Sequence, residues 1–322
     1  ASVFMLLTNS FVGNMVGLQH PLFQFAKAFP GNNSDMNGFG SYLGVFGMKM
    51  MYWAAFTILA GIIASEAWGR WKMTTLLKQN KWSTWMVVVV NLSILIVTGS
   101  FIKGNTVMES ATDATNWQQT YEATYRPYQH MLQPTITSVK TSIDLYPERK
   151  TYAIKGSYTL VNKNSQPIDS LLLYCDRRVT LETVQIQNAK LVKNDSASGH
   201  RLYQLITALQ PGDSISMEFT MAYSWSPYNR HDAQNAIVDN GAFMRISRYY
   251  PAFGYQSNNE IDNEAERKKR NMATATPLKK LEDSVIADYG FIEFEALIST
   301  TEKQIAIGTG ELVKSWTTNS RN

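Results

Sequence analysis

Long uncharged stretches mark the first hundred residues of the chain. Residues 83–102 carry no charged side chain, and residues 42–68 and 1–18 are also mostly apolar. A helix of about 20 apolar residues crosses the roughly 30 Å hydrocarbon layer of a bilayer. The pattern therefore predicts membrane spans at about 1–18, 42–68 and 83–102. Buried core helices of a soluble protein are the alternative for the last two.

After residue 135 the hydrophobic pattern acquires a period of two. Residues 151–161 and 214–225 alternate between apolar and polar positions, and shorter candidate strands lie at 168–174, 183–192, 201–207 and 292–298. Alternation of this kind is typical of strands with one buried face. We expect these positions to point inward: Tyr152, Ile154, Leu160, Met217, Phe219, Met221, Ile292 and Phe294. The predicted fold class is thus multi-domain, with transmembrane α-helices followed by a mostly antiparallel, β-sandwich-like domain.

The pattern divides the chain into a membrane region (1–102), a linker (103–134) and a β-domain (135–322). The linker is polar, with a loose helical period through Trp117, Tyr121 and Tyr125. We expect a linker that ends in a short helix packed on the β-domain, and that fully extended would span about 100 Å.

One insert interrupts the β-pattern. In residues 258–271 four acidic side chains precede four basic ones, which suits a helix capped by Asn258 or Asn259. Its basic run, Arg267–Arg270, is either the solvated face of that helix or a contact for an anionic surface.

Charge is distributed unevenly. Of 30 basic and 26 acidic residues, only six basic and two acidic ones lie in 1–102, which leaves 24 of each sign in 103–322. A polar region without net positive charge argues against a nucleic-acid binder. The loop 69–82 has four basic residues and no acid, so the positive-inside rule places it in the cytoplasm and residues 103–322 outside. A domain with the single cysteine Cys175, and hence no internal disulfide, is compatible with a bacterial periplasm.

The sequence contains no recognisable catalytic constellation. None of the four histidines stands in H-E-x-x-H spacing, so the zinc motif of the gluzincin peptidases is absent. His231 and Asp232 form a polar pair that suits a turn better than a catalytic dyad. Cys175 follows an apolar run and is expected to be a small core residue. We therefore predict no catalytic and no metal-binding residue within these 322 residues.

Several stretches resemble the N-terminal β-domain of the aminopeptidase N family of zinc metallopeptidases. They are YPERKTYAIKGSYTLVN (146–162), NGAF (240–243), YYPAFGYQ (249–256), FEALIST (294–300), QIAI (304–307) and GELVKSW (310–316). Together with YEATYRPY (121–128) and with MNGFGSY (36–42) before a span, they resemble a bacterial fusion in which an ABC-type transporter permease precedes an aminopeptidase. The chain then looks like an internal, non-catalytic fragment of such a fusion.

This resemblance carries further expectations. It implies no cofactor here, zinc in a catalytic domain beyond residue 322, and a location in the bacterial inner membrane. The implied partners are membrane lipid, that catalytic domain, a peptide substrate and a separate ATP-binding subunit, but no nucleic acid. The other hypothesis is a permease whose β-domain is a binding or structural module without peptidase activity.

One residue, Asn240, is singled out by the resemblance. In the family the β-domain lends one side chain, usually Gln or Glu, to hold the free amino group of the substrate. The matching position, eleven residues before Pro251, is Asn240. An Asn carbonyl oxygen can accept from an ammonium group. Asn240-Gly241 is also a favourable hairpin turn, and the two roles are compatible.

Overall fold

The computed structural model describes residues 20, 22–23, 40, 42–69, 81–106, 110–226, 228, 235–238, 241–245, 249–277, 291–318 and 320–322. The predicted span 1–18 and most of the basic loop 69–82 lie outside this part of the chain. The chain divides into two compact units, one formed by residues 1–110 with 226–233 and the other by residues 111–225 with 234–322.

The first unit contains two long helices, α3 (Tyr42–Gly69) and α4 (Lys81–Asn105). Both are long and apolar enough to cross a membrane, at the positions predicted for the second and third spans. Their apolar stretches are only 17% and 11% buried, unlike those of a typical core helix. The helices pack closely where Gly99 lies against the ring of Tyr52, because a Cβ at Gly99 would be 3.2 Å from that ring.

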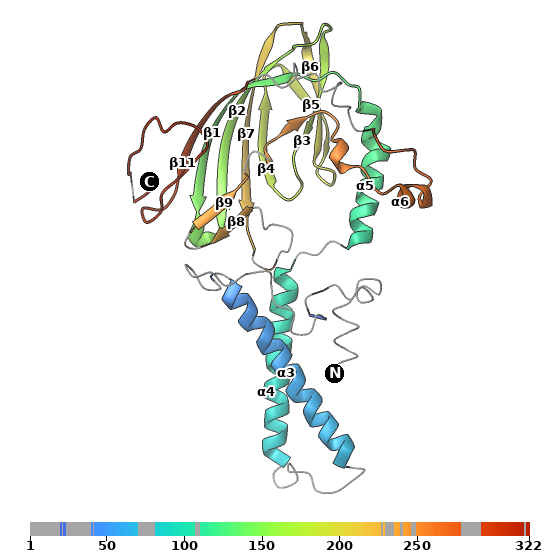
Figure 1. The fold of residues 1–322 in the computed structure, drawn as a ribbon, viewed down its shortest axis with the longest axis vertical. Coiled ribbons are helices and arrows are strands. Elements are labelled where there is room, and N and C mark those ends of the chain that lie inside the picture. The colour runs from blue at the N-terminus through green and yellow to red at the C-terminus, as the bar shows by residue number, and fades with distance from the viewer. Residues whose placement is uncertain are drawn as a thin grey trace. The chain divides into compact units, whose positions relative to one another are not determined.

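The second unit is a β-rich domain with mixed sheets (Figure 1). A five-stranded sheet has the order β11-β1-β2-β7-β4, a four-stranded sheet the order β10-β3-β6-β5, and β8 pairs with β9. The strands are β1 (Thr135–Tyr146), β2 (Thr151–Val161), β3 (Ile168–Tyr174), β4 (Thr180–Ile186), β5 (Ala189–Asp195), β6 (His200–Leu209), β7 (Ser214–Ser224), β8 (Asn235–Val238), β9 (Gly241–Met244), β10 (Ala252–Phe253) and β11 (Glu293–Ser299). Pairing is antiparallel except between β1 and β11, which run parallel.

The alternating pattern of β2 and β7 forms the centre of the core. The predicted inward residues of these strands are at most 2% exposed: Tyr152, Ile154, Leu160, Met217, Phe219 and Met221. Gly156 lies opposite Phe219 across the two strands, and a Cβ at Gly156 would overlap the Phe219 ring. The glycine therefore makes room for the phenyl group.

One predicted strand is wrong in its extent. Residues 183–192 do not form a continuous strand, because β4 ends at Ile186 and β5 begins at Ala189, each in a different sheet. Asn188, between them, has a left-handed backbone with φ 58°. Asn tolerates this conformation better than most residues, which allows the chain to turn from one sheet to the other.

Where the linker was expected to end in a short helix, the chain forms α5 (Ala111–Tyr125), followed by the 3-10 turn η1 (Arg126–Tyr128). Its aromatic stripe packs on the four-stranded sheet: Tyr121 and Tyr125 are 1% and 3% exposed and contact Leu172 of β3. A spacing of four residues places these rings on one face of the helix.

The acidic–basic insert also differs from its prediction. Its helix α6 (Glu264–Lys269) is short, follows the 3-10 turn η4 (Ser257–Asn259), and is capped by Asn263, which accepts from the amides of Ala265 and Glu266. Neither Asn258 nor Asn259 caps it. The residues before the cap contact α5 instead, through Gln256, Glu260 and Ile261.

Candidate functional site

The exposed edge of the five-stranded sheet is formed by β11. Ile292, just before it, and Phe294 within it were expected to point inward, yet they are 50% and 46% exposed. Phe294 does lie beside the buried Val139 of β1 in the parallel register. The prediction failed because alternation identifies a shared face but not whether another layer covers that face at the sheet edge.

The segment after β11 also exposes large apolar side chains. Nine large apolar side chains between residues 291 and 316 are at least 46% exposed: Phe291, Ile292, Phe294, Leu297, Ile305, Ile307, Leu312, Val313 and Trp316. Monomeric soluble proteins rarely expose so many neighbouring apolar groups, and such surfaces mark interaction sites. We call residues 291–316 the apolar edge.

The base of the apolar edge is held firmly. Thr300 and Asn322 exchange two backbone hydrogen bonds, of 2.8 and 3.0 Å. The Arg321 guanidinium lies 4.5 Å from the centre of the Tyr146 ring and donates to the backbone oxygen of Leu145 at 3.0 Å. Residues 301–318 are thus closed into a loop whose apolar side chains face outward.

A second feature lies on the polar face of the same sheet. An open depression of about 370 Å³ is lined by Lys140, Lys155, Thr183, Gln185, Glu218 and Glu295, among others. Lys140 and Glu295 form an ion pair of 3.1 Å between exposed side chains. Sequence reasoning missed this depression, because its residues come from five strands that only the fold brings together.

The predicted substrate anchor Asn240 lies outside the described residues. The strands on either side of it, β8 and β9, pair antiparallel with Val238 opposite Gly241. The aromatic-proline stretch from which the position of Asn240 was counted is part of the core. Tyr158 donates to the Pro251 oxygen at 3.1 Å, and the centres of the Phe219 and Tyr250 rings are 5.8 Å apart. Both roles of Asn240, as anchor and as turn residue, stay predictions.

The remaining candidate residues do not come together. His231 and Asp232 lie outside the described residues. Cys175 is buried as expected, and burial, followed by the nearby Asp176 charge, raises the pKa of its thiol to about 12. Among the described residues no group of three His, Cys, Asp or Glu side chains is placed to hold a metal ion. These residues therefore offer no ligand set for zinc.

No family model matches the chain, and no curated protein matches it. Solved structures similar to it include M1 zinc metallopeptidases. A mutant of the Deinococcus radiodurans enzyme bound to the substrate Tyr-Ser-Ala matches with 9% identity and a TM-score of 0.37, over 59% of this chain and 38% of the solved one. Another structure of the M1 zinc metallopeptidase from Deinococcus radiodurans gives 9% identity and a TM-score of 0.36, over 59% of this chain and 37% of the solved one. The match thus spans well under half of the solved chains.

Proposed function

We propose that this chain is the non-catalytic, membrane-anchored part of a fusion between an ABC-type transporter permease and a zinc aminopeptidase. In this proposal it is a multi-pass inner-membrane chain, and its sandwich-like β-domain lies in the periplasm and supports the substrate site of the peptidase. Asn240 reaches that site as an acceptor for the substrate's amino group. The sequence stretches that resemble the aminopeptidase family, and the order in which they follow one another along the chain, support this proposal.

The observation that carries the proposal is the apolar edge. Fully burying an apolar side chain of this size contributes about 1.5–3 kcal/mol, so a partner that covers several of them is strongly stabilised. Three of the stretches that resemble the family, 294–300, 304–307 and 310–316, lie within this surface. A catalytic domain that packs against it would place its substrate site beside the β-domain.

An association experiment tests this assignment. The parent reading frame should encode H-E-x-x-H within a few hundred residues after Asn322, and its product should release N-terminal amino acids in a chelator-sensitive way. The present chain alone should be inactive and should bind the separately produced catalytic domain. Ile305→Ser with Val313→Ser should weaken that binding at least about tenfold. The control is Val192→Ser with Ile206→Ser, which alters apolar side chains that are 61% and 64% exposed on the other sheet.

The second candidate is a permease with a β-domain that binds a ligand and has no peptidase. The open depression favours it, since Lys155 and Glu218 supply opposite charges beside hydroxyl and amide groups. A parent reading frame without the zinc motif, or without chelator-sensitive peptidase activity, would favour this reading over the first.

A further inference from the structure

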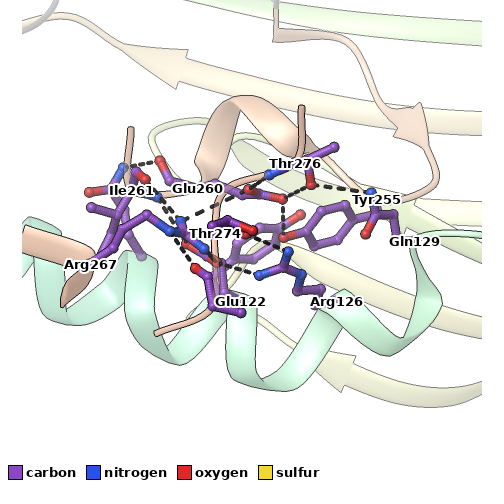
Figure 2. A network of polar contacts seen from close by, with 12 residues as sticks. Glu122, Arg126, Gln129, Tyr255, Glu260, Ile261, Arg267, Thr274 and Thr276 are labelled. Atoms are coloured by element: carbon purple, nitrogen blue, oxygen red, sulfur yellow. Dashed lines mark hydrogen bonds and ion pairs between the residues drawn. The ribbon is translucent and has the colours of Figure 1, made fainter. Parts of the chain in front are cut away.

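Two arginines of the insert at 258–271 are engaged with α5. Arg267 donates from both terminal nitrogens, at 2.9 and 2.8 Å, to the two carboxylate oxygens of Glu122, and both side chains are only 2% exposed (Figure 2). Arg270 donates to Asn116 at 2.8 Å. The helix α6 is therefore not wholly solvated, and the anion contact that its basic run suggested is excluded for both arginines.

The outward face of the five-stranded sheet is arranged differently. Two rows of side chains cross the open depression in the strand order β11, β1, β2, β7, β4. The first row is Glu295, Lys140, Ser157, Glu218 and Gln185, and the second is Leu297, Ser142, Lys155, Thr220 and Thr183. Ser142 and Ser157 are short side chains between longer neighbours, and they leave room for the depression. Its volume of about 370 Å³ is at the small end of ligand sites, which begin at about 300 Å³.

Two opposite charges in this depression are not paired with each other. Lys140 and Glu295 stand directly opposite and form an ion pair of 3.1 Å. Lys155 and Glu218 are diagonal neighbours on β2 and β7, and such neighbours are typically about 7–8 Å apart. Within the described part of the chain neither of them makes an ion pair or a side-chain hydrogen bond. A ligand with one positive and one negative group could therefore contact both at once.

The neighbouring side chains indicate what else the ligand carries. Ser157 and Gln185 flank Glu218 in its row and offer a hydroxyl and an amide to polar groups of a ligand. Leu297, at the β11 end of the other row, is 47% exposed and apolar. An amino acid has an ammonium group, a carboxylate and a side chain on one carbon. This combination matches a carboxylate, an ammonium and an apolar group gathered on one sheet face.

We propose that the depression binds a small zwitterion with an apolar side chain, either a free amino acid or a short peptide. Lys155 holds its carboxylate, Glu218 holds its ammonium group, and Leu297 contacts its side chain. The proposal names the ligand class of the second candidate function and rests on it to that extent. Binding is measured on this chain alone, however, whereas the reading frame after Asn322 tests the function.

Ligand-observed NMR on the full chain in lipid nanodiscs, with empty nanodiscs as background, measures the dissociation constants. The probes are L-leucine, 4-methylpentanoate, which lacks the ammonium group, and 3-methylbutylamine, which lacks the carboxylate. Leucine should bind about three- to fivefold more tightly than either analogue, the upper range for an exposed ion pair. L-leucylglycine distinguishes the two sources of the ligand, because the tighter of leucine and this dipeptide identifies a free amino acid or a peptide.

Variants of this chain assign each charge to its partner. Glu218→Gln should remove the advantage of leucine over 4-methylpentanoate, and Lys155→Met its advantage over 3-methylbutylamine. Leu297→Ser should reduce the preference for leucine over glycine. The control is Lys190→Met, which alters an exposed lysine on the four-stranded sheet and should change none of these ratios.

Thermal unfolding of each variant should match the wild-type chain, because Lys155, Glu218 and Leu297 are exposed. Leucine binding that is no tighter than that of both analogues, or ratios that survive Glu218→Gln and Lys155→Met, would overturn the proposal. Equal losses in Lys190→Met would do the same. A zinc motif in the parent reading frame would set aside the second candidate function and leave these ratios to decide the site.

Discussion

Phe219 of β7 fills the space that a side chain at Gly156 of β2 would occupy. The Gly156→Ala variant should therefore be destabilised by about 1–3 kcal/mol, the usual cost of overpacking a core. Urea unfolding of the detergent-solubilised chain, followed by fluorescence, measures it. In a Phe219→Ala background the cost of Gly156→Ala should nearly vanish, since the clash is gone. An equal cost in both backgrounds would place the strain elsewhere.

The converse change tests the core face. Phe219 is 2% exposed, so Phe219→Ala should lower the free energy of unfolding by about 3–5 kcal/mol through lost burial and a cavity. Phe243→Ala on β9 removes a ring that is 73% exposed and should cost well under about 1 kcal/mol. A loss of unfolding free energy below about 1 kcal/mol for Phe219→Ala would show that the wrong face of β7 was assigned to the core.

His200 should make the fold acid-sensitive. It is 1% exposed, its Nδ1 lies 3.0 Å from the Ser198 oxygen, and its Nε2 has no hydrogen-bond partner within the described part of the chain. Burial lowers the pKa of His200 from 6.5 to about 4, against the smaller opposing effects of Ser198 and Asp195. The folded state thus favours neutral His200, and its contribution is complete above about pH 6.5 and is lost as the pH falls through 4.

The His200→Phe variant isolates this contribution, because it keeps a ring against Tyr125 but cannot titrate. Between pH 7 and pH 4 the wild-type chain should lose about 3 kcal/mol more of its unfolding free energy than the variant does. Unfolding in urea at a series of pH values gives the two slopes. Parallel slopes would show that His200 does not titrate in this range.

Asn240 is tested in the parent enzyme with its catalytic domain. If its carbonyl oxygen holds the substrate's amino group, Asn240→Ala should lower kcat/KM for free-amine peptides at least about tenfold, or about 1.4 kcal/mol. Thermal unfolding of the same variant is the companion measurement. Unchanged kinetics with reduced thermal stability would leave Asn240 as a turn residue only.

Topology is tested by reporter fusions after Asn322. A phosphatase active only in the periplasm should be active there, and a reporter that works only in the cytoplasm should be silent. The reason is the excess of Lys and Arg in the loop 69–82. Replacing Arg70, Lys72, Lys78 and Lys81 by Gln should reduce the phosphatase signal. Activity of the cytoplasmic reporter in the unaltered chain would reverse the orientation.

The spacing of apolar residues along the chain predicted those elements of the fold that depend only on nearby residues. Strands β2 and β7, helices α3 and α4, and the aromatic stripe of α5 follow directly from the spacing of apolar residues. The exposure of Phe294 and the break at Asn188 were missed, because both depend on which strands become neighbours. Of the candidate site, the family resemblance supplied Asn240 and the expectation of an exposed edge or apolar patch at the C-terminal end of the β-domain, and the fold identifies the residues of the apolar edge.

The Glu122–Arg267 pair was beyond prediction for a similar reason. The two residues are 145 positions apart, and each stands in a polar segment that reads as solvated. Their burial arises only because α5 and residues 255–277 enclose both side chains. Charge patterning within one helix could not reveal a partner on another.

The parallel pairing of β1 with β11 has a consequence for how the domain is made. Ser138 lies beside Glu293, so the first strand of the β-domain receives this neighbour only after some 150 further residues have been synthesised. Contacts between such distant positions form late in folding. Until then the backbone groups along one edge of β1 are unpaired and can pair with a strand of another chain. Assembly of the nascent domain is therefore most vulnerable to aggregation at β1, and slow translation between residues 146 and 293 would prolong that period.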